Sequence, residues 1–211
     1  MGADSAHSEE SGTRALLCEM LRLFYDKGWV SGTGGGICAS LTEGRLLVAP
    51  TGVHKERVEP ADLFLIDPGT GDVIGSAADA ALRPSECTPI FSAIVRAGAG
   101  AVVHSHALSA VLAGDAAKGS VLTIESLEML KGLPEVSNTD VHFVPVIENA
   151  EHEPELTSDV ERALSEERFS SARAIVVRDH GAYIWGRDIW EAKKHTEVYH
   201  FLFEATVARR H

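Results

Sequence analysis

The sequence predicts a layered α/β domain built around a mixed β-sheet. Short apolar runs typical of strands alternate with amphipathic segments typical of helices along the 211 residues. Several predicted strands are separated only by tight turns, which indicates antiparallel hairpins beside the helix-linked strands. We see neither an internal repeat nor a linker, so we expect one domain over residues 13–211.

The first half of the chain predicts a packing helix and four strands. Thr13 can cap a helix over residues 14–27, whose apolar side chains form one stripe, and Gly28 can end it. The predicted strands cover residues 37–41, 46–49, 62–67 and 73–75. Residues 1–12 are acidic and polar, and we expect a disordered tail there rather than a targeting signal.

The second half predicts helices and strands in alternation, with Asp188 as the cap of a long final helix. The predicted helices cover residues 90–97, 109–117, 157–167 and 189–208, with a short segment at 126–131. The predicted strands cover residues 101–103, 141–147, 174–177 and 183–185. Together these elements give the mixed sheet.

Composition and charge exclude several classes of partner. The formal net charge is -12, which argues against nucleic acid or an anionic membrane, because both reward lysine and arginine. No apolar run is long enough to span a membrane. Cys18, Cys38 and Cys87 show no CxxC spacing, so neither a disulfide framework nor a zinc ribbon is indicated, and a reducing cytoplasm fits best.

Two histidines interrupt the apolar segment 101–113, AVVHSHALSAVLA. Side chains two apart on a strand share a face, so His104 and His106 point the same way and Ser105 points to the other face. An unpaired buried polar group costs roughly 1–3 kcal/mol. A divalent metal would satisfy both imidazoles, whereas a half-solvated strand would leave them to water; a third ligand elsewhere would decide for the metal.

Two loops are suited to binding an anion. The glycine-rich run at 31–36 lets backbone N–H groups approach a ligand closely, although a plain turn fits it as well. Residues 50–57, PTGVHKER, predict a turn that opens into a short helix with Thr51 as its cap and Lys55 near its first turn. A helix N-terminus with a lysine suits a phosphate, and a capped helix with solvated charges fits equally well.

Three further histidines lie near the end of the chain. His180 stands just past the apolar strand 174–177 and before Gly181, and loops at strand ends are where sites are usually built. His195 and His200 are five residues apart on the final helix, which is not a spacing that shares a face. We therefore expect packing or surface roles for these two.

Six motifs in this order resemble the class II aldolase/adducin-head superfamily, from Cys18 to Glu204. They are GWVSGTGGGI at 28–37, APTGVHKER at 49–57, CTP at 87–89, VHSH at 103–106, EMLKG at 128–132 and DHG at 179–181. The resemblance implies a three-layer α/β/α sandwich with a mixed, largely antiparallel central sheet. It also implies a homotetramer with active sites at subunit interfaces.

The resemblance implies one zinc ion per subunit, held by His104, His106 and His180. Three protein ligands with exchangeable positions are typical of a catalytic zinc. It assigns Glu128 as the catalytic acid/base and Cys87 to substrate contact. The implied phosphate-binding residues are Gly32, Thr33, Gly34, Thr51, Gly52 and Lys55.

Within the superfamily the motifs resemble its dehydratase branch, which acts in methionine salvage. The implied reaction removes water from 5-methylthioribulose 1-phosphate and gives 2,3-diketo-5-methylthiopentyl 1-phosphate. A metal that polarises the C2 carbonyl would acidify the C3 proton, and Glu128 would assist loss of the C4 hydroxyl.

Two alternatives remain open on the residues alone. Glu86 stands about where sugar-phosphate aldolases of the superfamily carry their catalytic glutamate, so retro-aldol cleavage of a 1-phosphoketose is the first. The second is a non-enzymatic scaffold of the adducin-head kind, which would not need to keep three histidines and a phosphate loop.

Overall fold

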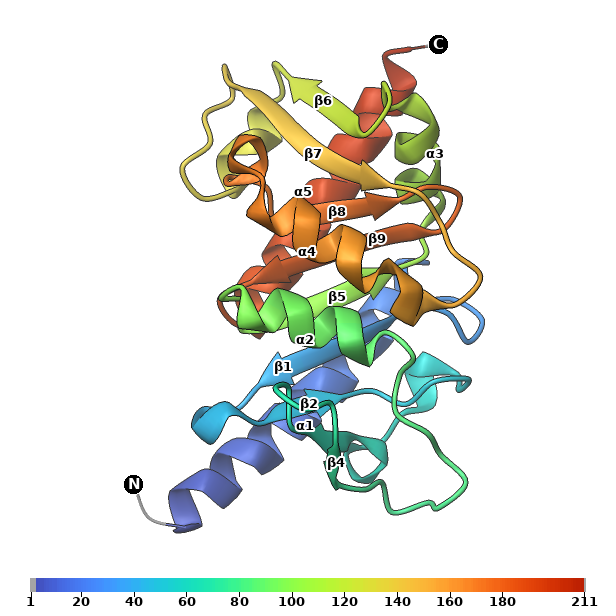
Figure 1. The fold of residues 1–211 in the computed structure, drawn as a ribbon, viewed down its shortest axis with the longest axis vertical. Helices are drawn as coiled ribbons and strands as arrows, with labels where there is room; N and C mark the ends of the chain where they lie inside the picture. The colour runs from blue at the N-terminus through green and yellow to red at the C-terminus, as the bar shows by residue number, and fades with distance from the viewer. Residues whose placement is uncertain (1–2, 211) are drawn as a thin grey trace.

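The structure is a computed structural model that describes residues 3–210. Its centre is a nine-stranded sheet with the order β4-β3-β2-β1-β5-β9-β8-β7-β6 (Figure 1). Neighbouring strands pair antiparallel, except β7 and β8, which pair in parallel. The strands are β1 Gly36–Ser40, β2 Leu46–Val48, β3 Phe64–Ile66, β4 Val73–Gly75, β5 Ala101–Ser105, β6 Val121–Glu125, β7 Val141–Ile147, β8 Ala174–Val177 and β9 Gly181–Gly186.

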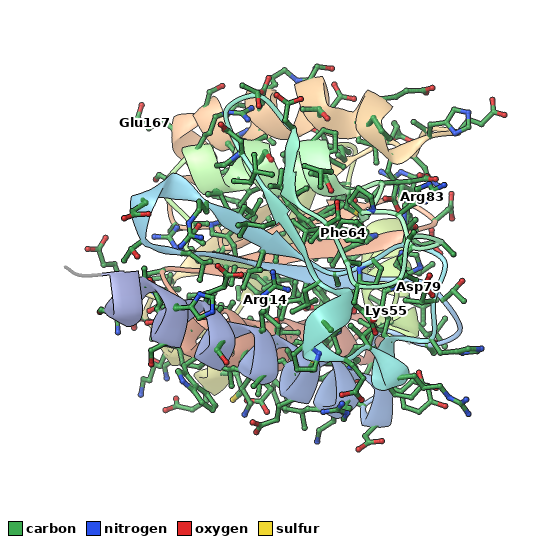
Figure 2. The ribbon with its side chains drawn as sticks, turned by 90° about the horizontal axis from the view of Figure 1, so that it is seen from below. Arg14, Lys55, Phe64, Asp79, Arg83 and Glu167 are labelled. Carbon is green, nitrogen blue, oxygen red and sulfur yellow. The ribbon has the colours of Figure 1, made fainter. Side chains whose placement is uncertain are left out.

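Helices cover both faces of this sheet. Three of them, α1 Ala3–Asp26, α3 Leu108–Ala116 and α5 Ile189–Ala208, pack against one face. The other two, α2 Thr88–Arg96 and α4 Thr157–Ser165, cover the opposite face. Figure 2 shows α1 on one side of the sheet and α2 with α4 on the other. The predicted three-layer α/β/α sandwich with a mixed, largely antiparallel sheet is confirmed.

Short 3₁₀ helices fill the connections between these elements. They are η1 Thr42–Gly44, η2 Lys55–Arg57, η3 Pro60–Asp62, η4 Glu128–Gly132, η5 Glu153–Leu156 and η6 Glu167–Phe169. Within residues 3–210, no helix is both long and apolar enough to cross a membrane.

The N-terminal segment differs from the prediction, because α1 begins at Ala3 and residues 3–12 are helical rather than a disordered tail. Thr13 therefore lies inside the helix and is not its cap. Contacts across the chain account for the extension: Glu10 forms ion pairs with Arg14 and with Arg45, each through a 2.9–3.0 Å contact. Residues 1 and 2 lie outside the described residues.

The end of α1 agrees with the prediction. Gly28 has a φ of 74°, a conformation that favours glycine, and its N–H donates to the carbonyl of Tyr25. The next N–H, that of Trp29, donates to the carbonyl of Phe24. Thus the glycine ends the helix and turns the chain toward the glycine-rich loop.

Two other elements were predicted incorrectly. Strand β6 was missed, although Val121–Glu125 buries alternate residues as an edge strand does. Thr51 caps no helix, because the short helix begins at Lys55 and His54 occupies its N-cap position.

The sheet topology brings the ends of several strands together at one end of the sheet. Strands β5, β7 and β8 end at this edge and β9 begins there, because Ser105 pairs with Ala182 and Ile147 pairs with Val177. The loops after residues 105, 147 and 177 are therefore neighbours in space. This end of the sheet, which we call the histidine edge, carries His106 just after β5 and His180 just after β8.

The core predicts a measurable effect for the Tyr199 hydroxyl. Tyr199 Oη accepts the backbone N–H of Arg173 at 2.9 Å and lies 2.9 Å from Nε2 of the buried His142. Tyr199→Phe leaves these groups unsatisfied and should lower the free energy of unfolding by about 1–3 kcal/mol. Urea denaturation measures the loss. The control Tyr25→Phe changes a residue that is 39% exposed and should stay within about 0.5 kcal/mol of wild type; equal effects would contradict this assignment.

Candidate metal centre

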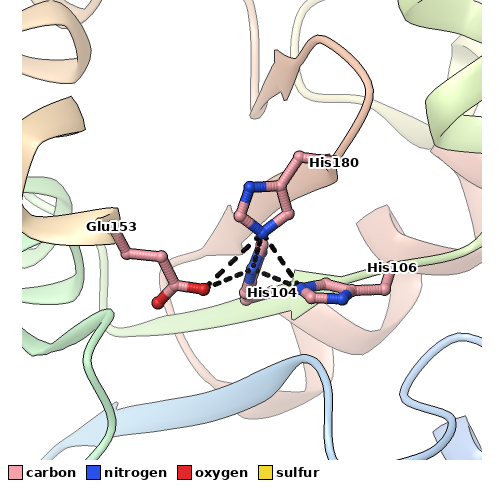
Figure 3. Close-up of side chains that lie close together, drawn as sticks. All are labelled: His104, His106, Glu153 and His180. Carbon is pink, nitrogen blue, oxygen red and sulfur yellow. Dashed lines mark hydrogen bonds and ion pairs between the residues drawn. The ribbon is translucent and has the colours of Figure 1, made fainter. Parts of the chain in front are cut away.

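Three imidazole nitrogens converge at the histidine edge (Figure 3). The Nε2 atoms of His104 and His106 are 2.8 Å apart, those of His104 and His180 are 3.2 Å apart, and those of His106 and His180 are 3.1 Å apart. In a tetrahedral site with bonds of about 2.0–2.1 Å, ligand atoms lie roughly 3.3 Å from one another. The three nitrogens are therefore spaced to share one ion.

The local structure places each ring. His104 lies within β5 and His106 just past its end, and their convergence agrees with the expected shared face. His104 also stacks on Tyr183 of the neighbouring strand, with ring centroids 4.1 Å apart. His180 stands in the turn between β8 and β9, preceded by Asp179, which has a φ of 55°.

Burial keeps these rings ready to act as ligands. His104 is fully buried, and burial lowers its pKa. Burial, together with the nearby His104 and His180, lowers the pKa of His106 to about 3. At neutral pH both rings are neutral, which is the form that binds a metal.

The hydrogen bonds of the Nδ1 atoms of His104 and His180 show whether their Nε2 atoms can bind a metal. Nδ1 of His104 lies 3.2 Å from the carbonyl oxygen of Ala182, and Nδ1 of His180 lies 3.0 Å from Oδ1 of Asn149. Because both partners are acceptors, each Nδ1 carries the proton and each Nε2 presents a lone pair to the centre. Two lone pairs 3.2 Å apart repel each other, whereas a cation between them binds both. The residues therefore fit a divalent metal.

Glu153 is the fourth member of this cluster, and sequence reasoning missed it. Its Oε1 lies 3.6 Å from Nε2 of His104 and 3.6 Å from Nε2 of His180 (Figure 3). Local pattern does not indicate Glu153, because only the pairing of β7 with β8 brings Asn149 and Glu153 beside His180.

The opposite face of β5 supports the two ligands. Ser105 Oγ lies 2.9 Å from Nε2 of His200 and accepts the N–H of Ala107 at 3.2 Å. The His200 ring stacks on Trp29 with centroids 4.3 Å apart, and the carbonyl of Trp29 accepts the N–H of His106 at 2.8 Å. His195 is also buried, with Nδ1 2.7 Å from the carbonyl of Trp185. Both α5 histidines thus have packing roles.

Lys55 joins the two loops predicted to bind phosphate. Its Nζ donates to the carbonyl of Thr33 at 2.8 Å and to that of Val53 at 3.2 Å. Lys55 is 1% exposed, and burial lowers its pKa while Cys87 and Glu153 act to raise it. Two of the three N–H groups of this ammonium donate to backbone carbonyls, which leaves the third to donate to a ligand.

Other members of the predicted phosphate set lie around this junction. Gly32 and Gly52 have φ values of 65° and 67°, and the N–H of Thr51 donates to the carbonyl of Arg83 at 3.0 Å. Gly34 passes so close to His106 that a Cβ atom there would lie 2.5 Å from Nδ1 of that ring. Its lack of a side chain therefore has a direct use in placing a metal ligand.

An open cleft of about 410 Å³ leads to the cluster. His106, Glu153 and His180 line it, together with Glu86, so the structure brings Glu86 to the mouth of the site. Cys87 is buried behind Glu153, and its thiol donates to Glu153 Oε2 at 2.6 Å. Burial and the nearby Glu153 raise the pKa of this thiol well above its usual value.

Glu128 lies away from the cluster of its own chain. Strand β6 runs antiparallel to β7, with Glu125 paired to Val141, so β6 ends opposite the histidine edge (Figure 1). Glu128 follows three residues after the end of β6. Its carboxylate accepts Lys131 Nζ at 2.7 Å and Asn138 Nδ2 at 2.7 Å, and it is exposed. Lys131 lowers the pKa of Glu128, so the group is ionised.

A larger cavity of about 450 Å³ near the start of β8 offers no comparable chemistry. The guanidinium of Arg173 on its wall donates to the carbonyls of Ser170 and Ala172, and Arg187 pairs with Asp188 and Glu191. The histidine cluster is therefore the stronger candidate site despite its smaller cleft.

Comparison with known proteins relates the chain to one family. A sequence model of the class II aldolase and adducin N-terminal domain matches residues 15–207. The chain is 41% identical to the methylthioribulose-1-phosphate dehydratase of Gallus gallus, over 92% of this chain and 82% of that protein. It is also 41% identical to the protein of the same name from Aquarana catesbeiana, over 97% of this chain and 87% of the relative. Among solved structures, an L-fuculose 1-phosphate aldolase superposes with a TM-score of 0.76 at 16% identity, over 93% of this chain and 85% of its own.

The close approach of Gly34 predicts a loss of metal binding. Gly34→Ala should displace the His106 ring and weaken zinc binding about 10- to 100-fold, as loss of a supporting contact does at metal sites. Gly12→Ala is the control, because no atom lies within 4 Å of the added Cβ. Titration of the metal-free proteins with zinc against a competing chelator measures both variants; equal affinities would show that the His106 ring tolerates the added group.

Proposed function

The chain belongs to the class II aldolase and adducin N-terminal domain family, and we propose that it is a metal-dependent lyase that dehydrates 5-methylthioribulose 1-phosphate. The product is 2,3-diketo-5-methylthiopentyl 1-phosphate, an intermediate of methionine salvage. We also propose one zinc ion per subunit and a cytoplasmic homotetramer, with neither nucleic acid nor a membrane as partner.

The convergence of His104, His106 and His180 carries this proposal. Relatives at 41% identity are named methylthioribulose-1-phosphate dehydratases, and the match spans nearly the whole of this chain. Three imidazoles around one point, with an open cleft beside them, provide the exchangeable positions that a catalytic metal needs. An adducin-like scaffold has no use for this arrangement.

The reaction breaks one C–H bond and one C–O bond. A divalent metal, when bound, supplies a positive charge that polarises the C2 carbonyl and makes the C3 proton more acidic. Glu128 is ionised, so it enters as a base and takes the C3 proton; it then returns a proton to the C4 hydroxyl, which leaves as water. The enol that remains across C3 and C4 becomes the second ketone. Lys55 and the loops around Gly32–Gly34 and Thr51–Gly52 hold the phosphate, and Cys87 lies behind Glu153, which lines the substrate cleft.

For Glu128 to act, it has to come from a neighbouring subunit. It lies at one edge of the sheet and the histidines lie at the other, so one copy does not bring them together. An exposed apolar side chain lies at each of these edges. Leu108, two residues after His106, is 70% exposed, and Val141, which pairs with Glu125 at the opposite edge, is 50% exposed. A head-to-tail contact between these edges forms a closed ring when its rotation completes a full turn, and a homotetramer with sites at its interfaces is such a ring.

One observation keeps a second reaction in view. Glu86 lines the cleft with His106 and His180, where it could serve a retro-aldol cleavage of a 1-phosphoketose. Both reactions begin beside a polarised ketone, and they differ in whether a C–O or a C–C bond breaks.

The product distinguishes the two reactions. We expect the zinc-loaded protein to convert 5-methylthioribulose 1-phosphate to the diketone without releasing an aldehyde. Ultraviolet absorption and mass spectrometry of the products measure this. His106→Ala should lose metal and turnover together. An aldehyde product would instead make this an aldolase with Glu86 as its base, and protein purified without stoichiometric metal would favour the scaffold.

Mixed assemblies test the shared site. Glu128→Gln should keep metal and fold but lose about 10²- to 10⁴-fold in turnover. Combining inactive Glu128→Gln subunits with inactive His106→Ala subunits, after dissociation and reassembly, should restore part of the activity, because some interfaces then pair a native Glu128 with a native metal site. No recovery in confirmed mixed assemblies would mean that Glu128 does not act across the interface.

A further inference from the structure

The three-histidine centre has a fourth neighbour to which the proposed reaction assigns no role. Glu153 Oε1 and the three Nε2 atoms lie within 4.8 Å of one another. We propose that Glu153 binds the metal through Oε1 as a fourth protein ligand, and that Cys87 is a positioning residue that orients its carboxylate. This inference rests on the metal site of the proposed function and is independent of the substrate.

The spacing of Oε1 fits one shared ion. It lies 3.6 Å from Nε2 of His104 and 3.6 Å from Nε2 of His180, close to the roughly 3.3 Å that separates ligand atoms in a tetrahedral zinc site. Figure 3 shows the carboxylate approaching from the side opposite His106, so the four donors surround one point. A set of three nitrogens and one oxygen suits a borderline ion such as zinc.

A simple ion pair does not account for this contact. Nδ1 of His104 and Nδ1 of His180 carry their protons toward Ala182 and Asn149, so neither Nε2 has a proton to donate to Glu153. An anionic oxygen facing two lone pairs at 3.6 Å is repelled. A cation bound between Glu153 Oε1 and the two Nε2 atoms attracts all three, so the contact becomes favourable.

The second oxygen of Glu153 is held from behind. Its Oε2 accepts the thiol proton of Cys87 at 2.6 Å, and Cys87 is only 3% exposed. The backbone N–H of Cys87 donates to Ser85 Oγ at 3.2 Å, which fixes the residue at the start of α2. Carboxylate ligands are usually hydrogen-bonded by such an outer partner. With Oε2 held by the thiol, Oε1 is left for the metal.

This arrangement gives Cys87 a role that does not require it to touch substrate. Glu153 is 21% exposed and lines the cleft, whereas the thiol is buried behind it. A metal held by the three histidines would therefore have Glu153 on its cleft side, with the thiol holding that carboxylate from behind.

Metal titration tests the ligand without any substrate. Metal-free Glu153→Gln should bind zinc at least about tenfold more weakly than wild type. Its cobalt(II) complex should differ in visible absorption, which reports the number and type of ligands. Glu151→Gln is the matched control, because it removes the same charge from the same cleft two residues away. It should keep the wild-type spectrum and change the zinc affinity less than about twofold, as screening of an exposed charge allows.

Two substitutions at Cys87 test the positioning role. Cys87→Ala should alter the cobalt spectrum and weaken zinc binding, and Cys87→Ser should restore both, because a hydroxyl can donate to the same oxygen. Thermal unfolding of the metal-free proteins checks their fold, and Glu153→Asp replaces Glu153→Gln if that variant does not fold. The proposal would be overturned if cobalt-loaded Glu153→Gln kept the wild-type spectrum, or if Glu153→Gln and Glu151→Gln lost zinc affinity equally. It would also be overturned if Cys87→Ala and Cys87→Ser had the same spectrum and the same zinc affinity. A failed dehydration assay leaves these readouts intact.

Discussion

The structure depends on three imidazole nitrogens that are held within 3.2 Å of one another at one edge of the sheet. The Nδ1 atoms of His104 and His180 face acceptors on the far side of their rings, which turns their Nε2 lone pairs inward, so a cation between them stabilises the arrangement. Topology forces the meeting: an antiparallel pair brings the end of β5 beside the start of β9, and the parallel pairing of β7 and β8 adds the loop that carries Asn149 and Glu153. The sheet acts as the frame of the metal centre.

Much of this frame was predictable from local pattern. Apolar runs located most strands, and the period of two along β5 was enough to place His104 and His106 on one face. His180 entered through the resemblance of its Asp-His-Gly motif. Glu153 could not be found in this way, because its place beside His180 depends on the pairing of two strands that are far apart in the sequence, Ile147 with Val177. Such long-range pairing leaves no local signature in the sequence.

The prediction of a disordered tail failed for a similar reason. Residues 3–12 have the polar, acidic composition of a disordered segment, yet Glu9 and Glu10 find partners in Thr42, Arg14 and Arg45. Gly34 shows the reverse case: its motif indicated an anion loop, and the structure adds a steric reason, since the His106 ring occupies the space of a side chain. Composition reports what a segment can do alone, and tertiary contacts decide what it does.

The distance between the two edges of the sheet limits what a single copy can achieve. His180 follows β8 at one edge and Glu128 follows β6 at the other, and the seven residues of β7 connect these edges. At about 3.3 Å per residue, that strand alone is longer than any side chain can span. An acid/base at Glu128 and a metal at His104, His106 and His180 are therefore compatible only if the edges belong to different copies. Catalysis would then require assembly, and the exposed Leu108 and Val141 at these edges would serve the reaction by bringing its two halves together.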